Sequence, residues 1–110
     1  MPGPVNVTIG GYQFACYPLA NAGFINIAAV YVILCVAQSG ATTVLDVGQS
    51  GELGERIESH PRRDSWFHHC PAGNIWVCIY PTPTNQVTKE QRLTLESTLR
   101  QQYKPPCGER

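Results

Sequence analysis

The chain has 110 residues, the length of one domain with one hydrophobic core. Hydrophobic residues make up 43% of it and charged residues 15%, which excludes the disordered and fibrous classes. The formal net charge is zero, so the chain as a whole does not attract a polyanion. All eight lysines and arginines nevertheless lie from Arg56 onward, and any surface that faces phosphate must come from that half.

The cysteines and the longest apolar run bear on the cellular compartment of the protein and on membrane association. The cysteines number five, and Cys35 and Cys78 lie in strand-like apolar runs, where a thiol behaves as a small buried hydrophobe. These features predict a reduced, cytoplasmic chain. Residues 22–37 are apolar except for Asn26, but this run is shorter than the roughly 18 residues of a membrane span, and no basic residue precedes it as in a signal peptide. We therefore expect a core segment and no membrane partner.

The first third of the chain has the pattern of strands. Polar and apolar residues alternate over residues 5–9 and again over residues 12–16, with Gly10-Gly11 between them, and this predicts a β-hairpin within residues 1–20. Residues 30–36 form a β-branched apolar run, which predicts a central strand buried on both faces.

A further strand and a short helix follow. The segment 43–47 comes after a tight turn and is expected to pair antiparallel with the strand before it. Ser50 can cap a helix of about two turns, with Leu53 and Ile57 on its apolar side and Pro61 soon after its end.

The last part of the chain predicts one strand and one longer helix. Residues 60–73 are rich in Pro, Arg, His and Asp and indicate a loop or irregular helix, whereas residues 75–80 have the composition of a strand. Thr88 and Gln91 have the spacing of a capping box at the start of a helix that ends near Pro105.

Three motifs follow one another in a recognisable order. Ala29-Val30-Tyr31 lies on one strand, Asp46-Val47-Gly48 on the next, and Arg56 on the helix after it. This order resembles the GIY-YIG nuclease family, in which a GIY strand, a YIG strand and a helix with an essential arginine succeed one another. The family's arginine lies eight residues after the YIG glycine, as Arg56 does here. The resemblance covers residues 29–106.

The resemblance implies a fold class and a domain organisation. We expect one α/β (α+β) domain over residues 1–110, with a small central antiparallel or mixed sheet flanked by helices. Residues 1–20 would then be a hairpin added in front of the family-like core.

The resemblance also implies a catalytic site. Arg56 would bind the phosphate, His60 would assist from the same helix face, and Tyr31 would handle the attacking water. Glu96 on the last long helix matches the family's metal ligand and would hold Mg²⁺ or Mn²⁺. Asp46 stands where the family usually has tyrosine, so it either joins the metal shell or marks a site that no longer cuts.

The loop after this helix adds candidate nucleic-acid contacts. Arg62, Arg63 and His68 can approach a phosphate backbone, and Trp66 can stack on bases beside them. The alternative is a solvated loop without a ligand. His and Cys residues here are of metal-ligating type, but no pair has the spacing of a zinc site.

Together these features predict a metal-dependent endonuclease that hydrolyses DNA phosphodiester bonds. Because the net charge is zero, DNA binding should be weak unless a partner or a homodimer strengthens it. The alternative is a degenerate, non-catalytic binding or assembly module, in which the uncharged hairpin caps a sheet edge or forms a dimer contact. Taken singly, Tyr31 also fits a core aromatic, and Arg56 and Glu96 also fit surface ion pairs.

Overall fold

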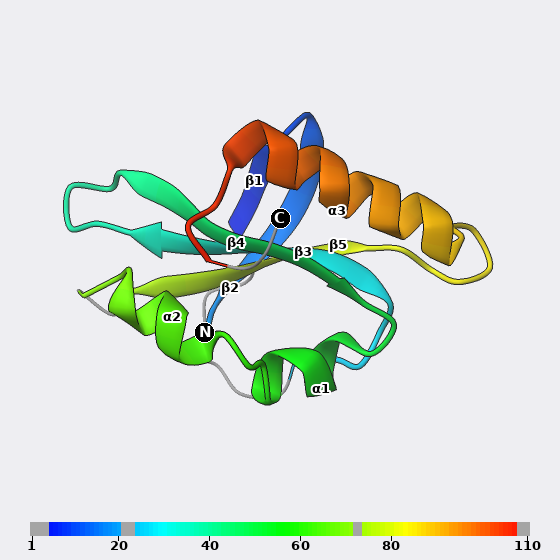
Figure 1. Cartoon of the computed structure of the whole chain (residues 1–110), viewed down its shortest axis with the longest axis horizontal. Helices are drawn as coiled ribbons and strands as arrows, with labels where there is room; N and C mark the ends of the chain where they lie inside the picture. The colour runs from blue at the N-terminus through cyan, green and yellow to red at the C-terminus, as the bar shows by residue number, and fades with distance from the viewer. Residues whose placement is uncertain (1–4, 21–23, 72–73, 108–110) are drawn as a thin grey trace.

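The computed structural model describes residues 5–20, 24–71 and 74–107. It contains both strands and helices, in the order shown by the colours of Figure 1. The elements are β1 (Val5–Ile9), β2 (Tyr12–Pro18), β3 (Ala29–Val36), β4 (Thr42–Ser50), α1 (Leu53–Glu58), α2 (Arg63–His68), β5 (Ile75–Pro81) and α3 (Lys89–Tyr103).

The strands form one antiparallel sheet with the order β1-β2-β5-β3-β4. Strand β3 lies inside the sheet between β5 and β4, as its β-branched run predicts, and β4 is an edge strand. Gly10 and Gly11 make the hairpin turn with φ of 60° and 87°, values that favour glycine. The predicted α+β fold and the N-terminal hairpin are confirmed.

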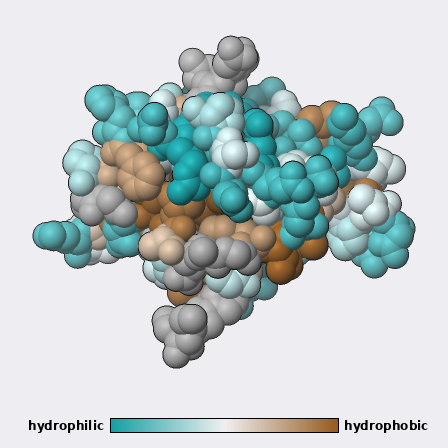
Figure 2. Space-filling view, turned by 90° about the horizontal axis from the view of Figure 1, so that it is seen from below, coloured by the Kyte–Doolittle hydropathy of each residue, from teal (hydrophilic) through white to brown (hydrophobic). Residues whose placement is uncertain are grey.

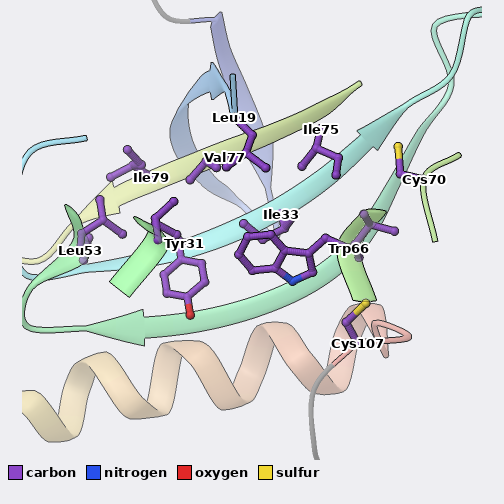
Figure 3. Close-up of a cluster of buried hydrophobic side chains, with 13 residues drawn as sticks. Leu19, Tyr31, Ile33, Leu53, Trp66, Cys70, Ile75, Val77, Ile79 and Cys107 are labelled. Atoms are coloured by element: carbon purple, nitrogen blue, oxygen red, sulfur yellow. The ribbon is translucent and has the colours of Figure 1, made fainter. Parts of the chain in front are cut away.

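The sheet is covered on both faces. In Figure 1, α3 lies above the sheet and α1 and α2 lie below it. Successive residues of β3 point to opposite faces, so Val32 packs in one core with Leu99 of α3, while Ile33 packs in the other with Leu53 of α1 and Trp66 of α2. Figure 3 shows this second core, and Figure 2, seen from below, shows a largely hydrophilic surface with an apolar area near its middle.

The helix boundaries agree closely with the sequence signals. Thr88 and Gln91 form the predicted capping box, and α3 ends at Tyr103, before the prolines. At α1 the cap position is Glu52, although the Ser50 hydroxyl does accept the Glu52 backbone N–H at 2.9 Å. The segment after His60, predicted as a loop or irregular helix, contains the short helix α2.

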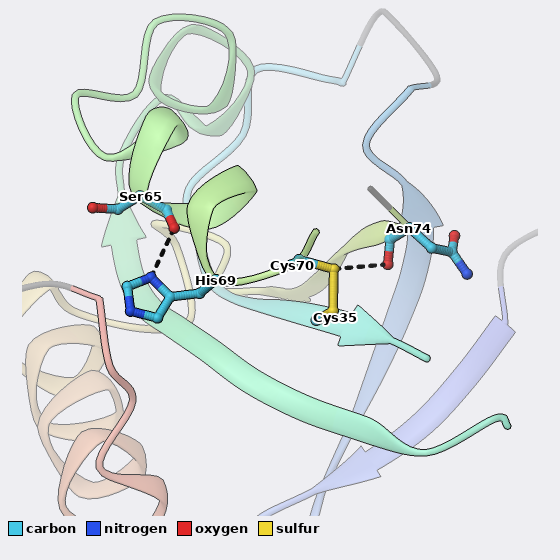
Figure 4. The surroundings of a disulfide bond; sticks show 5 residues. All are labelled: Cys35, Ser65, His69, Cys70 and Asn74. Carbon is cyan, nitrogen blue, oxygen red and sulfur yellow. Dashed lines mark hydrogen bonds between the residues drawn. A yellow bond between two sulfur atoms is a disulfide. The ribbon is translucent and has the colours of Figure 1, made fainter. Parts of the chain in front are cut away.

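The cysteine prediction requires a correction. The structure contains the disulfides Cys16–Cys78 and Cys35–Cys70, so the prediction that Cys35 and Cys78 are free thiols is wrong. Cys16 and Cys78 are directly opposed on paired strands, and Cys70 follows α2 close to the end of β3, as Figure 4 shows. Cys107 is a buried free thiol.

Disulfides are typical of an oxidising compartment, so the cysteines do not support the predicted cytoplasmic location. Within residues 5–20, 24–71 and 74–107, no helix is both long enough and apolar enough to cross a membrane.

Candidate functional site

Tyr31 and Gly48 fit together at the centre of the site. They are paired across β3 and β4, and the Tyr31 side chain is fully buried. A Cβ atom on Gly48 would overlap with the hydroxyl oxygen and the ring of Tyr31. Figure 3 shows the ring extending from β3 across β4. Glycine is therefore required at position 48 to give the phenol its place.

His60 lies beyond the end of α1 at Glu58, so the prediction that it shares a helix face with Arg56 is wrong, but it fixes the hydrogen bonding of the phenol. Its Nε2 lies 2.7 Å from the Tyr31 hydroxyl, and its Nδ1 accepts the Arg62 backbone N–H at 3.0 Å. Because a backbone N–H can only donate, Nδ1 carries the lone pair, and in a neutral ring Nε2 carries the hydrogen. His60 therefore donates to the Tyr31 oxygen, which leaves the phenol's own hydrogen available for another acceptor.

The electrostatics agree with this arrangement. Burial lowers the pKa of His60 from its ordinary value of 6.5 to about 4, and the neighbouring Arg62 and Arg56 act in the same direction. Burial raises the pKa of Tyr31, although the Arg56 guanidinium opposes this effect. At neutral pH the imidazole is neutral and the phenol is protonated. Arg56 itself is exposed and can contact a substrate.

Asp46 is an acceptor for several donors. Its fully buried carboxylate accepts hydrogen bonds from Arg62 Nε at 2.8 Å, Arg100 Nη2 at 2.5 Å and Trp66 Nε1 at 2.8 Å. One of its oxygens also accepts the Val47 backbone N–H at 2.9 Å. Two arginines and an indole surround both oxygens, so the alternative in which Asp46 joins a metal shell is wrong for this structure.

One of the predicted nucleic-acid contacts is buried in the structure, and the other three stay at least partly exposed. Trp66 is fully buried, with its indole held by Asp46, so the prediction that it stacks on bases is wrong. Arg62 also bonds Asp46, but 27% of its side chain stays exposed. Arg63 donates to the backbone oxygen of Ile57 at 2.8 Å and is half-buried, while His68 is exposed on the last turn of α2.

Glu96 lies on α3, and the arginines near Asp46 and Tyr31 act on its carboxyl group. Burial raises the pKa of this half-buried carboxyl, whereas the nearby arginines, Arg100 foremost, lower it. The other two arginines are Arg62 and Arg56. The charges of these arginines reach Glu96 from the other side of the sheet. The structure brings Tyr31, His60 and Arg56 together, whereas Glu96 makes no hydrogen bond or salt bridge to them within the described residues.

Glu96 stays the predicted ligand of a divalent cation, and no contact in the structure tests this. Mg²⁺ commonly binds one or two carboxylates and takes its other ligands from water and substrate phosphates, and Glu96 can be that carboxylate. Among residues 5–20, 24–71 and 74–107 there is no group of three or more His, Cys, Asp or Glu side chains that could hold a metal alone. A cation here would depend on the phosphate for the rest of its shell.

The charges at this edge of the sheet are mixed. Arg56, Arg62 and Arg100 lie near Asp46 and Glu96, and Arg56 is also flanked at α1 by Glu52, Glu55 and Glu58. Sequence reasoning missed Arg100. Its four-residue spacing from Glu96 was the available signal, but that spacing also fits a surface ion pair.

No family model, curated protein or solved structure matches the chain. The resemblance to GIY-YIG nucleases remains a prediction that rests on the motif order and on the geometry of this site.

Proposed function

We propose that the protein is a GIY-YIG-type phosphodiesterase that hydrolyses DNA with the help of Mg²⁺ or Mn²⁺. The observation behind this proposal is that Tyr31, His60 and Arg56 interact with one another, and that the charge of Arg56 also acts on Glu96, the predicted metal ligand. Tyr31 and His60 are hydrogen-bonded, and Arg56 acts on both.

Each residue has a role that follows from its chemistry. The exposed Arg56 guanidinium binds the non-bridging oxygens of the phosphate, where negative charge increases during attack. The Tyr31 side chain is fully buried, so its hydroxyl has no access to water in this structure, and its predicted role toward the attacking water requires the site to open. His60 Nε2–H stabilises negative charge on the Tyr31 oxygen if the phenol gives up its proton. A divalent cation at Glu96 would neutralise charge on the leaving oxygen.

Asp46 acts indirectly in this account. It does not reach the substrate, because its side chain is fully buried. It holds Arg62 from the α1–α2 side and Arg100 from α3, so it fixes the two faces of the site relative to each other. Asp46 is therefore a positioning residue and not a catalytic one.

A second function is favoured by two observations. The Asp46 ion pairs take up part of the positive charge at the position where the family usually has tyrosine, which suits binding without cleavage. Strand β1 is also an edge of the sheet, and Val5 on it is 49% exposed, so the hairpin can pair with another chain. The second candidate is therefore a non-catalytic binding or assembly module.

A plasmid-nicking assay with Mg²⁺ or Mn²⁺ tests the first proposal against the second. We expect the wild type to nick, and Arg56→Ala and Glu96→Gln to lose about 10²- to 10³-fold of the rate. Glu90→Gln and Lys104→Asn are the matched controls, because both side chains are exposed on or beside α3, and they should nick like the wild type. Equal background cutting by all five proteins would contradict the proposal, and DNA binding without nicking would support the second candidate.

A further inference from the structure

Residues 59–70 lie over the hydroxyl of Tyr31. His60 in this segment is buried, and its Nε2 lies 2.7 Å from that hydroxyl. The fully buried Trp66 packs against the imidazole, with 4.6 Å between the two ring centres. Figure 3 shows the rings of Tyr31 and Trp66 on the same face of the sheet. We call residues 59–70 the cover, because they carry the imidazole that contacts the phenol and the indole that packs against it.

The cover is held to the sheet by side-chain contacts and by a covalent bond. Arg62 and Trp66 both donate to the Asp46 carboxylate on β4, at 2.8 Å each. Beyond α2, Cys70 forms a disulfide with Cys35 of β3, as Figure 4 shows, across a sequence separation of 35. Reduction breaks this bond and leaves every other contact of the cover chemically unchanged.

The two disulfides differ in their access to solvent. Cys16 and Cys78 are 2% and 0% exposed, so a reductant reaches their bond only if the sheet opens. Cys35 is partly exposed, although its partner Cys70 is buried. Thiol–disulfide exchange needs direct attack on a sulfur atom, and exposed disulfides are typically the labile or regulatory ones. Cys35–Cys70 is therefore the bond that a dithiol can reduce in the folded protein.

We propose that the Cys35–Cys70 disulfide holds the cover closed over Tyr31, and that its reduction by a dithiol opens the site. This inference rests on the proposed function, because it assigns a redox control to that same site. The phenol is fully buried and in contact with His60, so its predicted role toward water requires the cover to move.

The reduction balances in two exchange steps. A thiolate of the dithiol attacks the Cys35 sulfur, the bond between the two protein sulfurs breaks, and Cys70 leaves as a thiolate that takes up a proton. The second thiol of the reductant then displaces Cys35, which leaves in the same way. The protein gains two electrons and two protons, and the dithiol becomes its own disulfide.

Hydrogen exchange of the two tryptophan indole N–H groups, followed by NMR, measures the opening without any DNA. We expect dithiothreitol to speed exchange of the Trp66 indole by at least about tenfold, because loss of the cross-link favours the open state. The Trp76 indole is the internal control. It lies on β5 against the other core, on the α3 side of the sheet, and its exchange rate should not change.

A double variant identifies the bond. Cys35→Ser combined with Cys70→Ser should exchange like the reduced wild type, and dithiothreitol should change its rates no further. If this variant does not fold, alkylation of the native wild type with iodoacetamide and peptide mapping test the same point. After reduction, Cys35 and Cys70 should carry the label, whereas Cys16 and Cys78 should stay bridged.

The nicking assay measures the effect on the site, and we expect the reduced wild type to nick DNA at least about tenfold faster than the oxidised one. Four outcomes overturn the inference: unchanged exchange at Trp66 after reduction, an equal rise at Trp66 and Trp76, reduction of Cys16–Cys78 as readily as Cys35–Cys70, or equal nicking rates in the two redox states. The proposed function fails separately. If reduction speeds exchange at Trp66 alone and neither form nicks DNA, hydrolysis is refuted and the redox-controlled cover stands. If both forms nick equally, only the redox control is refuted.

Discussion

Replacing Gly48 by alanine tests the fit between β4 and the Tyr31 ring. The new Cβ would lie within 2.8 Å of the ring's Cε1 and closer still to the hydroxyl, so the ring must leave its place. Overpacking of this kind costs about 1–3 kcal/mol. A displaced phenol also leaves the buried His60 Nε2–H without its acceptor, which costs about 1–3 kcal/mol more. We expect a total of about 3 kcal/mol.

Thermal unfolding followed by circular dichroism measures this loss, since each kcal/mol lowers the Tm of a domain of this size by about 4–8 °C. Gly51→Ala is the matched control, because a Cβ there meets nothing closer than 3.8 Å. In a Tyr31→Val background, Gly48→Ala should cost little, as no ring remains to be displaced. An equal cost of Gly48→Ala in both backgrounds would refute the reasoning.

Three further predictions concern the surroundings of this ring. Between pH 6.5 and about 4 the unfolded chain binds a proton at His60 that the folded chain does not, so stability should fall by about 3 kcal/mol as the pH drops through this window. Urea unfolding at several pH values measures this, and His60→Gln should lack that part of the slope. Asp46→Asn should lower the free energy of unfolding by about 3–5 kcal/mol, because Arg62 and Arg100 lose the carboxylate that pairs with them. A loss below about 1 kcal/mol would contradict this expectation. Replacing Cys35 and Cys70 by serine should cost about 2–4 kcal/mol, and a reducing agent should then change stability less than in the wild type.

Much of the fold was predictable because its signals are local. The alternation of polar and apolar residues predicted the hairpin, a β-branched run predicted β3, and the Thr88 capping box predicted the start of α3. Each of these depends on residues close together in the chain. The α2 helix was only partly predicted, because six residues with one buried side chain, Trp66, give little periodicity.

The parts of the site that were not predicted depend on long-range contacts. The Asp46 ion pair with Arg100 joins residues separated by 54 positions, and the Arg92 bond to Gln49 spans 43. Nothing in the local sequence distinguishes these arginines from solvated helix residues. The disulfide partners likewise became evident only when the strand register opposed Cys16 to Cys78.

We propose that the β4 edge of the sheet cleaves phosphodiester bonds. The most direct test of this proposal is the single-turnover cleavage rate of an end-labelled DNA strand with Mn²⁺, measured in parallel for the wild type, Arg56→Ala, Glu96→Gln and Lys104→Asn. We expect cleavage by the wild type and Lys104→Asn, and rates at least about 100-fold lower for Arg56→Ala and Glu96→Gln. Equal rates in all four proteins, or no cleavage by any of them, would contradict it.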